Sequence, residues 1–262
     1  QAVQQILDTL AQEALLPSTD ILLMSDHGQA TVSTTIDVAT ELIDAGLKRS
    51  SESTDILVAG KGGSISLYVS DNRPETVNEI IKFLLPHDWC GPIFTSAQSH
   101  SDETFPLSLI HCEHPRAPSL LMAFNWQERR NNHGARGCGA FAKAGVTIGS
   151  GSHGSLSCYE IHNVLIASGP HFKQDITSMI PSGNIDILPT LLEILNLPTD
   201  HVVAGRILTE SLRQHDAPSE ASIQTQIHHR SLNHQGINIV QKLRTIQVGS
   251  TPYIDYGWKT RS

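Results

Sequence analysis

The sequence predicts an α/β fold built on a mostly parallel sheet that helices cover on both faces. Apolar residues recur with helical spacing in some segments and with strand spacing in others, and the two kinds of segment alternate along the chain. The run "NVLIASG" at 163–169 is continuously apolar and ends at a glycine, which is typical of a strand buried on both faces. A length of 262 residues suits one large domain.

The first half of the chain predicts helices and strands in alternation. Apolar residues at three- and four-residue spacing predict a first helix: Val3, Ile6, Leu7, Leu10, Ala14 and Leu15. Pro17 ends it, and a strand follows over 21–24. The next expected elements are a helix over 36–47 ended by Gly46, a strand over 65–69, and a helix that Pro74 begins.

The second half continues the alternation and then becomes polar. Strands are expected at 107–110, 120–124 and 163–169, followed by a helix over 187–197 with Asp186 as its N-cap. Residues 1–212 are therefore expected to form the body of the domain, and 213–232, rich in Gln, Ser and His, a linker or surface loop. Residues 233–262 contain two β-like runs joined at Gly249–Ser250, and we expect them to pack on the same domain.

Composition narrows the classes of partner. The formal net charge is −8, with 39% hydrophobic and 17% charged residues, which argues against binding a phosphate backbone by bulk positive charge. No apolar stretch reaches the roughly 18 residues needed to cross a bilayer. The four cysteines have no CxxC spacing, so neither a zinc ribbon nor a thioredoxin-like pair is indicated. These observations argue against nucleic acid as the partner, and the chain shows no membrane segment.

The segment "LLMSDHGQA" at 22–30 places an acid and an imidazole at the end of an apolar run. In open parallel sheets, sites form beyond the carboxyl ends of strands, and Asp26 and His27 occupy such an end. Successive strand residues point to opposite faces, so two adjacent ligands reach one ion only if the backbone bends, which Gly28 permits. The alternative is a strand-end aspartate that caps its own turn.

A second candidate segment is "GSGSHGSLSCYEIHNVLIASGP", where His153 lies in a Gly/Ser-rich loop before the run at 163–169. Such a loop allows close approach of a ligand, and neutral imidazole is a common zinc ligand. The alternative is a flexible loop with a solvent-exposed histidine. His162 and His171, which flank the same run, are expected to be structural. "NNHGARG" at 131–137 is either an ordinary turn or the lining of a substrate mouth, and "GKGG" lacks full phosphate-loop spacing.

Five motifs in order resemble the type I phosphodiesterase/nucleotide pyrophosphatase family of the alkaline phosphatase superfamily. They are "LLMSDHGQ", "AFNW...NNHGARG", "GSHGSLSCYEIHNVLIASGPHF", "PSGNIDILPTLLEILNLP" and "AGRIL", and the resemblance extends to about Leu212. It implies a three-layer α/β/α sandwich with a mostly parallel central sheet, incomplete at the N-terminus. It also implies a hydrolase with two Zn²⁺, or another divalent metal, and a phosphodiester or nucleotide substrate.

The resemblance implies specific metal ligands in this chain. Asp26 and His27 would ligate the zinc that also holds the nucleophile, and His153 would ligate the other zinc. Carboxylate and imidazole suit zinc, and two ions ~4 Å apart can stabilise the entering and leaving oxygens of a displacement at phosphorus. Three ligands are too few for two ions.

The nucleophile and the remaining ligands are expected upstream. In the family, the Thr or Ser nucleophile, an early Asp and an Asp-x-x-x-His pair precede the helix that leads into Asp-His-Gly. Asp71, Asp88 and Asp102, among others, have no histidine four residues on. The chain is therefore expected to be the C-terminal part of a catalytic domain, without catalytic residues and inactive as it stands. The family also makes a secreted or periplasmic location plausible.

Two other functions share these features. One is a phosphomonoesterase or a phosphonate- or sulfate-ester hydrolase of the same superfamily, because the metal ligands are shared and substrate choice depends on other parts. The other is a non-catalytic, degenerate domain. A degenerate domain predicts no zinc binding even when the preceding residues are present.

Overall fold

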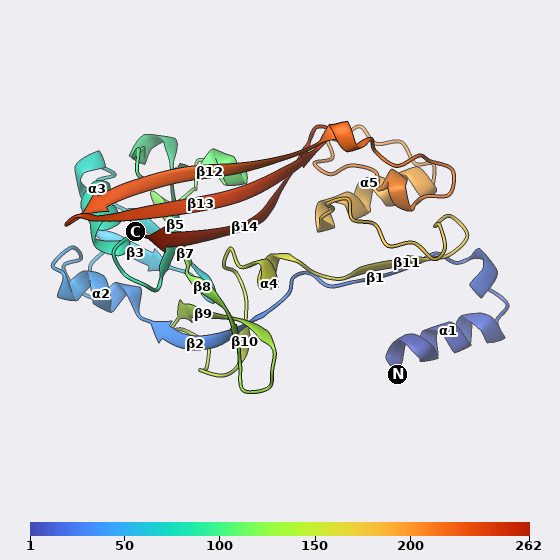
Figure 1. Ribbon diagram of the computed structural model, residues 1–262, viewed down its shortest axis with the longest axis horizontal. Helices are drawn as coiled ribbons and strands as arrows, with labels where there is room; N and C mark the ends of the chain where they lie inside the picture. The colour runs from blue at the N-terminus through green and yellow to red at the C-terminus, as the bar shows by residue number, and fades with distance from the viewer. The chain divides into compact units, whose positions relative to one another are not determined.

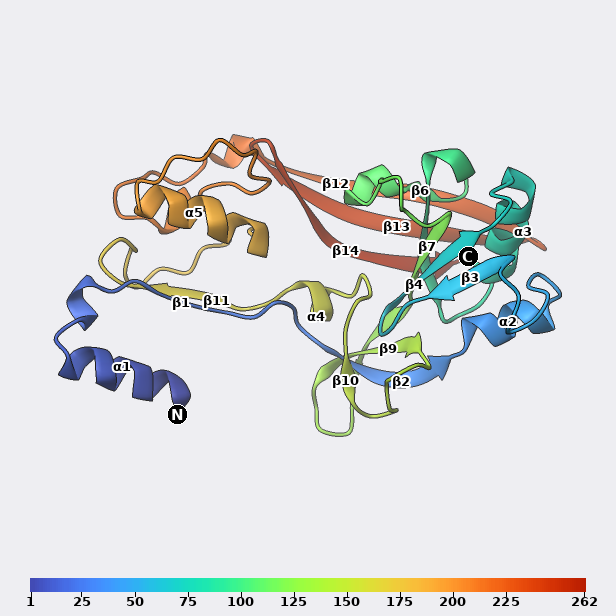
Figure 2. The same cartoon turned by 180° about the vertical axis from the view of Figure 1, so that it is seen from behind.

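The computed structural model describes residues 1–262, apart from the side chain of Ala221, and divides into two compact units. Unit 1 comprises residues 1–26, 163–225 and 246–253, and unit 2 comprises residues 27–162, 226–245 and 254–262. Figures 1 and 2 show the elements from opposite sides. Each unit is thus assembled from segments that lie far apart in the sequence.

The sheet of unit 1 has two antiparallel strands, β1 (Ile21–Met24) and β11 (Leu165–Ser168). Ile21 lies opposite Ser168, and Met24 lies opposite Leu165. The helical elements of this unit are α1 (Ala2–Gln12), η1 (Leu16–Ser18), η4 (Asn184–Asp186), α5 (Ile187–Ile194), η5 (Thr209–Ser211) and η6 (Glu220–Ser222).

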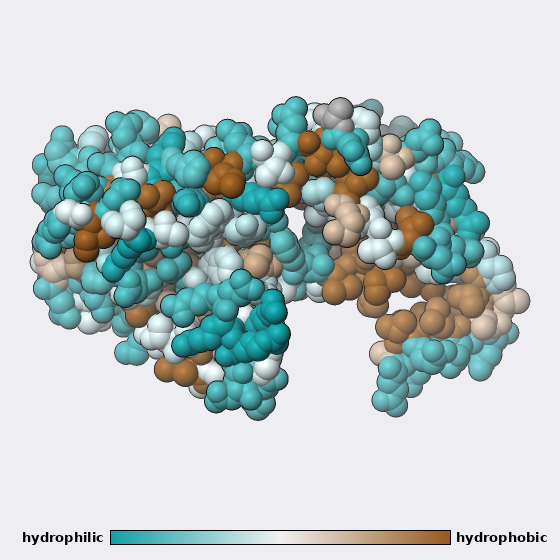
Figure 3. Space-filling model, in the orientation of Figure 1, coloured by the Kyte–Doolittle hydropathy of each residue, from teal (hydrophilic) through white to brown (hydrophobic). Residues whose placement is uncertain are grey.

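Unit 1 carries much apolar surface. Leu23, Met24, Val164 and Ile166 each expose at least 40% of their surface, and Figure 3 shows apolar residues over the region of β1, β11 and α5. A cavity of about 780 Å³ lies beside β11, lined largely by residues 165–182. Neither His27 nor His153 lines this cavity.

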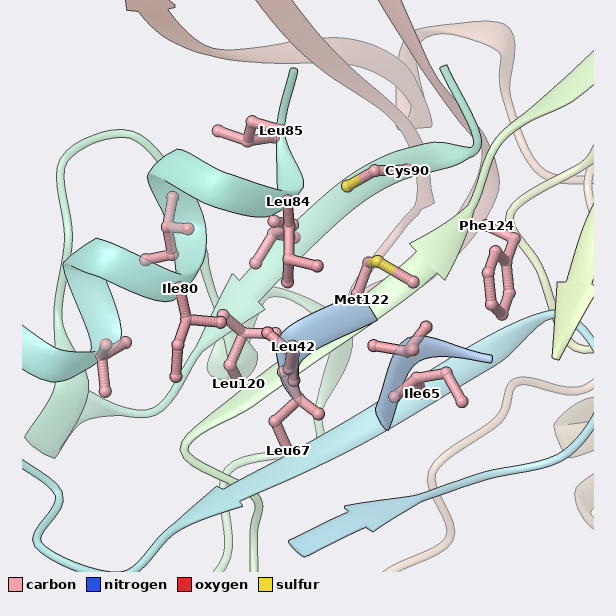
Figure 4. Packing of buried hydrophobic residues seen from close by; sticks show 14 of the residues in the cluster. Leu42, Ile65, Leu67, Ile80, Leu84, Leu85, Cys90, Leu120, Met122 and Phe124 are labelled. Atoms are coloured by element: carbon pink, nitrogen blue, oxygen red, sulfur yellow. The ribbon is translucent and has the colours of Figure 1, made fainter. Parts of the chain in front are cut away.

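The largest sheet of unit 2 has five strands in the order β3-β4-β7-β5-β6. They are β3 (Ile56–Ala59), β4 (Ser64–Val69), β7 (Leu120–Phe124), β5 (Cys90–Thr95) and β6 (Phe105–Pro106). Alternate residues of β4 and β7 pack against the helices α2 (Val38–Asp44) and α3 (Pro74–Leu84). Figure 4 shows this core, in which Leu42, Leu67 and Met122 are fully buried.

A second sheet of unit 2 has the order β10-β2-β9-β8. Its strands are β10 (Gly151–Ser152), β2 (Ala30–Ile36), β9 (Arg136–Ala142) and β8 (Trp126–Arg130). The short elements of unit 2 are η2 (Ala97–Ser99), η3 (Leu107–Ile110) and α4 (Cys158–Ile161). Strands β2 and β10 run antiparallel, and this pairing brings the chain before Ala30 next to the chain after Ser152.

Three long strands close the chain in the order β12-β13-β14: β12 (Ile223–His234), β13 (Ile237–Val248) and β14 (Thr251–Arg261). The hairpin expected at Gly249–Ser250 joins β13 to β14, and Gly249 adopts a φ of 59° there. In unit 2, Leu243 and Ile254 of these strands pack with Phe94 and Phe105. That cluster is separate from the core under α2 and α3.

The expected mostly parallel three-layer sandwich is wrong. The described strands pair mainly antiparallel, with parallel pairing at β2·β9 and β5·β6, and the structure has 23% helix and 34% strand. The alternation of helical and strand periodicity gave the wrong strand direction, because several apolar runs continue into hairpins rather than into a crossover helix. The run at 163–169 is also half exposed, although its sequence is typical of a buried strand.

Single elements and boundaries differ as well. Residues 107–110 form a 3-10 turn instead of a strand, and β2 occupies residues 30–36, before the helix that was expected to begin at 36. The expected linker at 213–232 includes the first ten residues of β12, whose polar side chains hide the strand in the sequence. Within the described residues, no helix is long and apolar enough to cross a membrane.

Candidate metal centre

Asp26 and His27 lie in the connection from β1 to β2, where the chain passes from unit 1 to unit 2. In unit 1 the backbone before this point is fixed: the Ser25 N–H donates to the Val164 carbonyl at 3.1 Å. The Asn184 amide donates to the Asp26 carbonyl at 2.7 Å. Asp26 is exposed, whereas His27 is half-buried.

The ring of His27 has a defined tautomer. Its Nδ1 lies 2.7 Å from the carbonyl oxygen of Gly28. A carbonyl can only accept a hydrogen bond, so in the neutral ring Nδ1 carries the proton and Nε2 carries the lone pair. Histidine ligands of metals are commonly oriented by this kind of bond to a backbone carbonyl.

Gly28 is required by a close backbone contact. A Cβ at this position would lie 2.3 Å from the Tyr159 carbonyl oxygen and 2.7 Å from that of His162. The Gly28 N–H also donates to the Glu160 carbonyl at 2.7 Å. Gly28 is not among the residues with positive φ, so lack of a side chain, rather than an unusual backbone conformation, explains the glycine.

His153 follows β10 directly and lies at the same end of the sheet as His27. Ser152 pairs with Ala30, and His27 precedes Ala30 by three positions. The two imidazole rings are stacked, with centroids 3.6 Å apart and an interplanar angle of 18°. The antiparallel pairing of β10 with β2 therefore brings together two of the three residues that the sequence singled out.

The GKGG segment supports the His153 loop from the other side. The Gly63 N–H donates to the His153 carbonyl at 2.7 Å. A Cβ at Gly62 would lie 2.3 Å from the same oxygen, and one at Gly63 would lie 2.1 Å from the Ser155 nitrogen. This segment therefore contacts protein backbone, and its glycines serve that contact instead of a phosphate.

Glu160 is a residue that the sequence reasoning missed. Its side chain is 2% exposed and accepts hydrogen bonds from the Ser155 N–H and hydroxyl, both at 2.7 Å. Burial raises the pKa of the Glu160 carboxyl, and the bonds from Ser155 oppose that effect. The pattern Ser157-x-x-Glu160 is a capping box in sequence, and it could have drawn attention to this position.

The two histidines that flank the run at 163–169, and Arg206 of the AGRIL motif, have structural partners. The Nε2 of His162 lies 2.6 Å from Asp255, and the Nδ1 of His171 lies 2.6 Å from Asp20. Arg206 forms two bonds to Glu210, at 2.6 and 2.8 Å.

The structure also describes the NNHGARG segment and the expected helix cap at Asp186. In "NNHGARG", the Asn131 side chain accepts the N–H groups of His133 and Ala135, which closes the β8–β9 hairpin. Asp186 precedes α5 as expected, but its side chain accepts from the Gly183 N–H rather than from the first turn of that helix.

The donor set fits zinc in kind but not in number. Imidazole and carboxylate are zinc ligands, and catalytic zinc usually has three protein ligands per ion. Across the residues that the structure describes, no group of three or more His, Cys, Asp or Glu side chains is arranged to hold a metal ion. Within the described residues, His27 and His153 therefore do not by themselves make up a complete metal site.

Comparison with protein-family models, characterised proteins and solved structures found no match to this chain. The family resemblance rests on the motifs alone.

Proposed function

We propose that this chain carries the metal-binding residues of a zinc-dependent phosphoric-ester hydrolase of the phosphodiesterase/nucleotide pyrophosphatase type. In this proposal Asp26, His27 and His153 are metal ligands, and the substrate is a small phosphodiester or nucleotide. The proposal uses the order of the motifs and the geometry of two imidazoles. It does not use the fold, which differs from the expected sandwich.

The observation that carries the proposal is the stacking of His27 on His153 at 3.6 Å. Ring nitrogens hold their lone pairs in the plane of the ring, so two stacked rings direct them side by side rather than toward one point. This arrangement suits one ion per ring better than one shared ion. Two-metal hydrolases hold their ions ~3.5–4 Å apart, a separation similar to that of the rings.

The tautomer of His27 also supports its assignment as a metal ligand in this proposal. The bond from Nδ1 to the Gly28 carbonyl fixes both the ring orientation and the position of the lone pair. The half-buried ring of His27 is thus held by a backbone acceptor at 2.7 Å and by the ring of His153 against its face. Asp26, bonded to His27 through the chain, adds a carboxylate, and its backbone is held by Asn184.

In this proposal the chain supplies part of the chemistry. When bound, zinc supplies Lewis acidity toward the phosphoryl oxygens and toward an attacking water. His27 and His153 contribute imidazole ligands. By the resemblance, a Thr or Ser nucleophile and further ligands are needed that are not among residues 1–262. Attack by that hydroxyl on phosphorus would form a covalent phospho-enzyme and release the alcohol or nucleotide, and water would then cleave the phospho-enzyme.

The test uses the protein produced together with its preceding residues. Zinc stoichiometry and hydrolysis of a nitrophenyl nucleotide diester are measured for the wild type and for His27→Ala, His153→Ala and His114→Ala. His114 is an exposed histidine between η3 and β7 and serves as the matched control. We expect His27→Ala and His153→Ala to lose zinc and at least 100-fold in turnover, and His114→Ala to keep both.

The outcomes separate the alternatives. Unchanged zinc content and turnover in both His27→Ala and His153→Ala would show that these residues are not ligands. Faster hydrolysis of a nitrophenyl monoester than of the diester would instead support a phosphomonoesterase of the same superfamily. A wild type that binds no zinc would support a non-catalytic domain.

A further inference from the structure

We infer that Glu160 is the residue that positions both imidazoles of the candidate metal centre. Its carboxylate holds the loop that carries His153, and its backbone carbonyl holds the turn that carries His27. This inference deepens the proposed function and rests on it for its chemical meaning. The positioning itself can be measured without a metal.

The carboxylate of Glu160 is bonded to Ser155, two residues after His153. Its Oε2 accepts the Ser155 N–H at 2.7 Å and its Oε1 accepts the Ser155 hydroxyl at 2.7 Å. Gly154 adopts a φ of 103°, so the loop turns sharply there and needs such anchoring.

The backbone of Glu160 is bonded to the residue that follows His27. The Gly28 N–H donates to the Glu160 carbonyl at 2.7 Å, and the bare Cα of Gly28 packs against the carbonyls on either side of that contact. The residue directly after His27 and the residue two positions after His153 therefore both bind Glu160. A shift of Glu160 would move the two rings relative to each other.

The hydrogen bonds around α4 differ from those of an ordinary capping box. In a capping box the glutamate at the third helical position accepts the N–H of the N-cap residue, here Ser157. Instead, the Ser157 N–H donates to the Ser155 hydroxyl at 3.1 Å, and the Glu160 carboxylate reaches two residues further, to Ser155. The carboxylate thus acts on the His153 loop rather than on the start of its own helix.

Burial makes this arrangement specific for glutamate. At 2% exposure the carboxylate has exchanged water for the two Ser155 donors. Glutamine would replace one carboxylate oxygen by an NH₂ group, which can only donate, so the Ser155 hydroxyl would have to reverse and accept, and both bonds would lose the charge of the carboxylate. Aspartate is shorter by one methylene and would not reach both groups of Ser155 from the same backbone position.

The experiment compares Glu160→Gln with the wild-type chain of residues 1–262. The first measurement is the nuclear Overhauser effect between the ring protons of His27 and His153 in the metal-free protein. The second is the affinity for Zn²⁺ by calorimetric titration. We expect Glu160→Gln to lose the cross-peak and to bind zinc 10–100-fold more weakly, the usual effect of removing a group that orients a ligand.

Glu210→Gln is the matched control for a general loss of stability. Glu210 is also buried, at 6% exposure, and bonds to Arg206 in unit 1. This variant is expected to be less stable but to keep the cross-peak and the zinc affinity. An equal loss of zinc affinity in both variants would overturn the positioning role, as would a cross-peak retained in Glu160→Gln with zinc affinity within twofold of the wild type.

The design also separates this inference from the proposed function. If residues 1–262 show the cross-peak but bind no zinc, the cross-peak in Glu160→Gln alone decides the positioning role, and the proposed function is decided separately by the zinc and turnover measurements described above. If Glu160→Gln does not fold, Ser155→Ala removes only the hydroxyl donor. That variant is expected to weaken the cross-peak and to lower zinc affinity severalfold, and an unchanged Ser155→Ala would then overturn the inference.

Discussion

Replacement of Gly28 by alanine tests whether the His27 turn depends on its backbone contact with α4. The added Cβ would lie 2.3 Å from the Tyr159 carbonyl oxygen, whereas ordinary contacts begin at 3.4 Å. The turn must therefore retreat by about 1.1 Å (3.4 − 2.3). The same movement stretches the bond from the Gly28 N–H to the Glu160 carbonyl, which is 2.7 Å long.

The expected loss of stability follows from two contributions. Overpacking against a fixed backbone costs ~1–3 kcal/mol, and loss of one hydrogen bond costs about 1 kcal/mol. Gly28→Ala should therefore reduce the free energy of unfolding of unit 2 by about 2–4 kcal/mol. Urea unfolding followed by tryptophan fluorescence measures this quantity, because Trp89, Trp126 and Trp258 all belong to unit 2.

Gly134→Ala is the control within the same unit. Gly134 has a φ of 82° and no heavy atom within 4 Å of an added Cβ, so the change introduces only backbone strain of ~1 kcal/mol. If Gly28→Ala costs no more than Gly134→Ala and keeps the cross-peak between His27 and His153, the contact with α4 does not hold the turn.

Three further outcomes are expected. In Gly63→Ala the added Cβ would lie 2.1 Å from the Ser155 nitrogen. This variant should displace the His153 loop and abolish the cross-peak between the rings of His153 and His27. A retained cross-peak would show that the GKGG segment does not hold the His153 loop in place. The hydrogen bond from the Ser53 hydroxyl, followed by those from Arg49, holds the pKa of Asp55 well below 3.8 in the folded protein. The ionised Asp55 carboxylate therefore stabilises the fold fully above pH 3.8, and this stabilisation is lost as the pH falls further. Urea midpoints at pH 6 and pH 3 should therefore differ more in the wild type than in Asp55→Asn, and equal differences would exclude this linkage. Arg206→Met leaves the buried Glu210 carboxylate without its ion-pair partner and should lower the free energy of unfolding by ~3–5 kcal/mol, measured by thermal unfolding. The double variant Arg206→Met/Glu210→Leu should recover most of that loss.

The sequence predicted single elements better than their assembly. Periodicity located β1 and α3, and Pro74 marked the start of α3 correctly. Strand direction is a different matter, because a strand of β4 or β7 has the same alternation in parallel and antiparallel sheets. The polar strand β12 was missed since its side chains are mostly exposed and give no apolar period.

The candidate site was predicted in part for a similar reason. Residue chemistry identified His27 and His153, but their stacking depends on the pairing of β10, a strand of only two residues that leaves no pattern in the sequence. Glu160 was missed because its role lies in hydrogen bonds to Ser155 that no periodicity records. Asp26 stays a predicted ligand on the basis of the motif.

The register of β2 against β10 sets where the two histidines lie relative to each other. Thr31 lies opposite Gly151 and Ala30 opposite Ser152. A slip of one residue would move His153 by ~3.3 Å and turn it to the other face of the sheet. A single residue added between Ala30 and Thr31 would therefore separate the histidines even if every other contact of the His153 loop were kept.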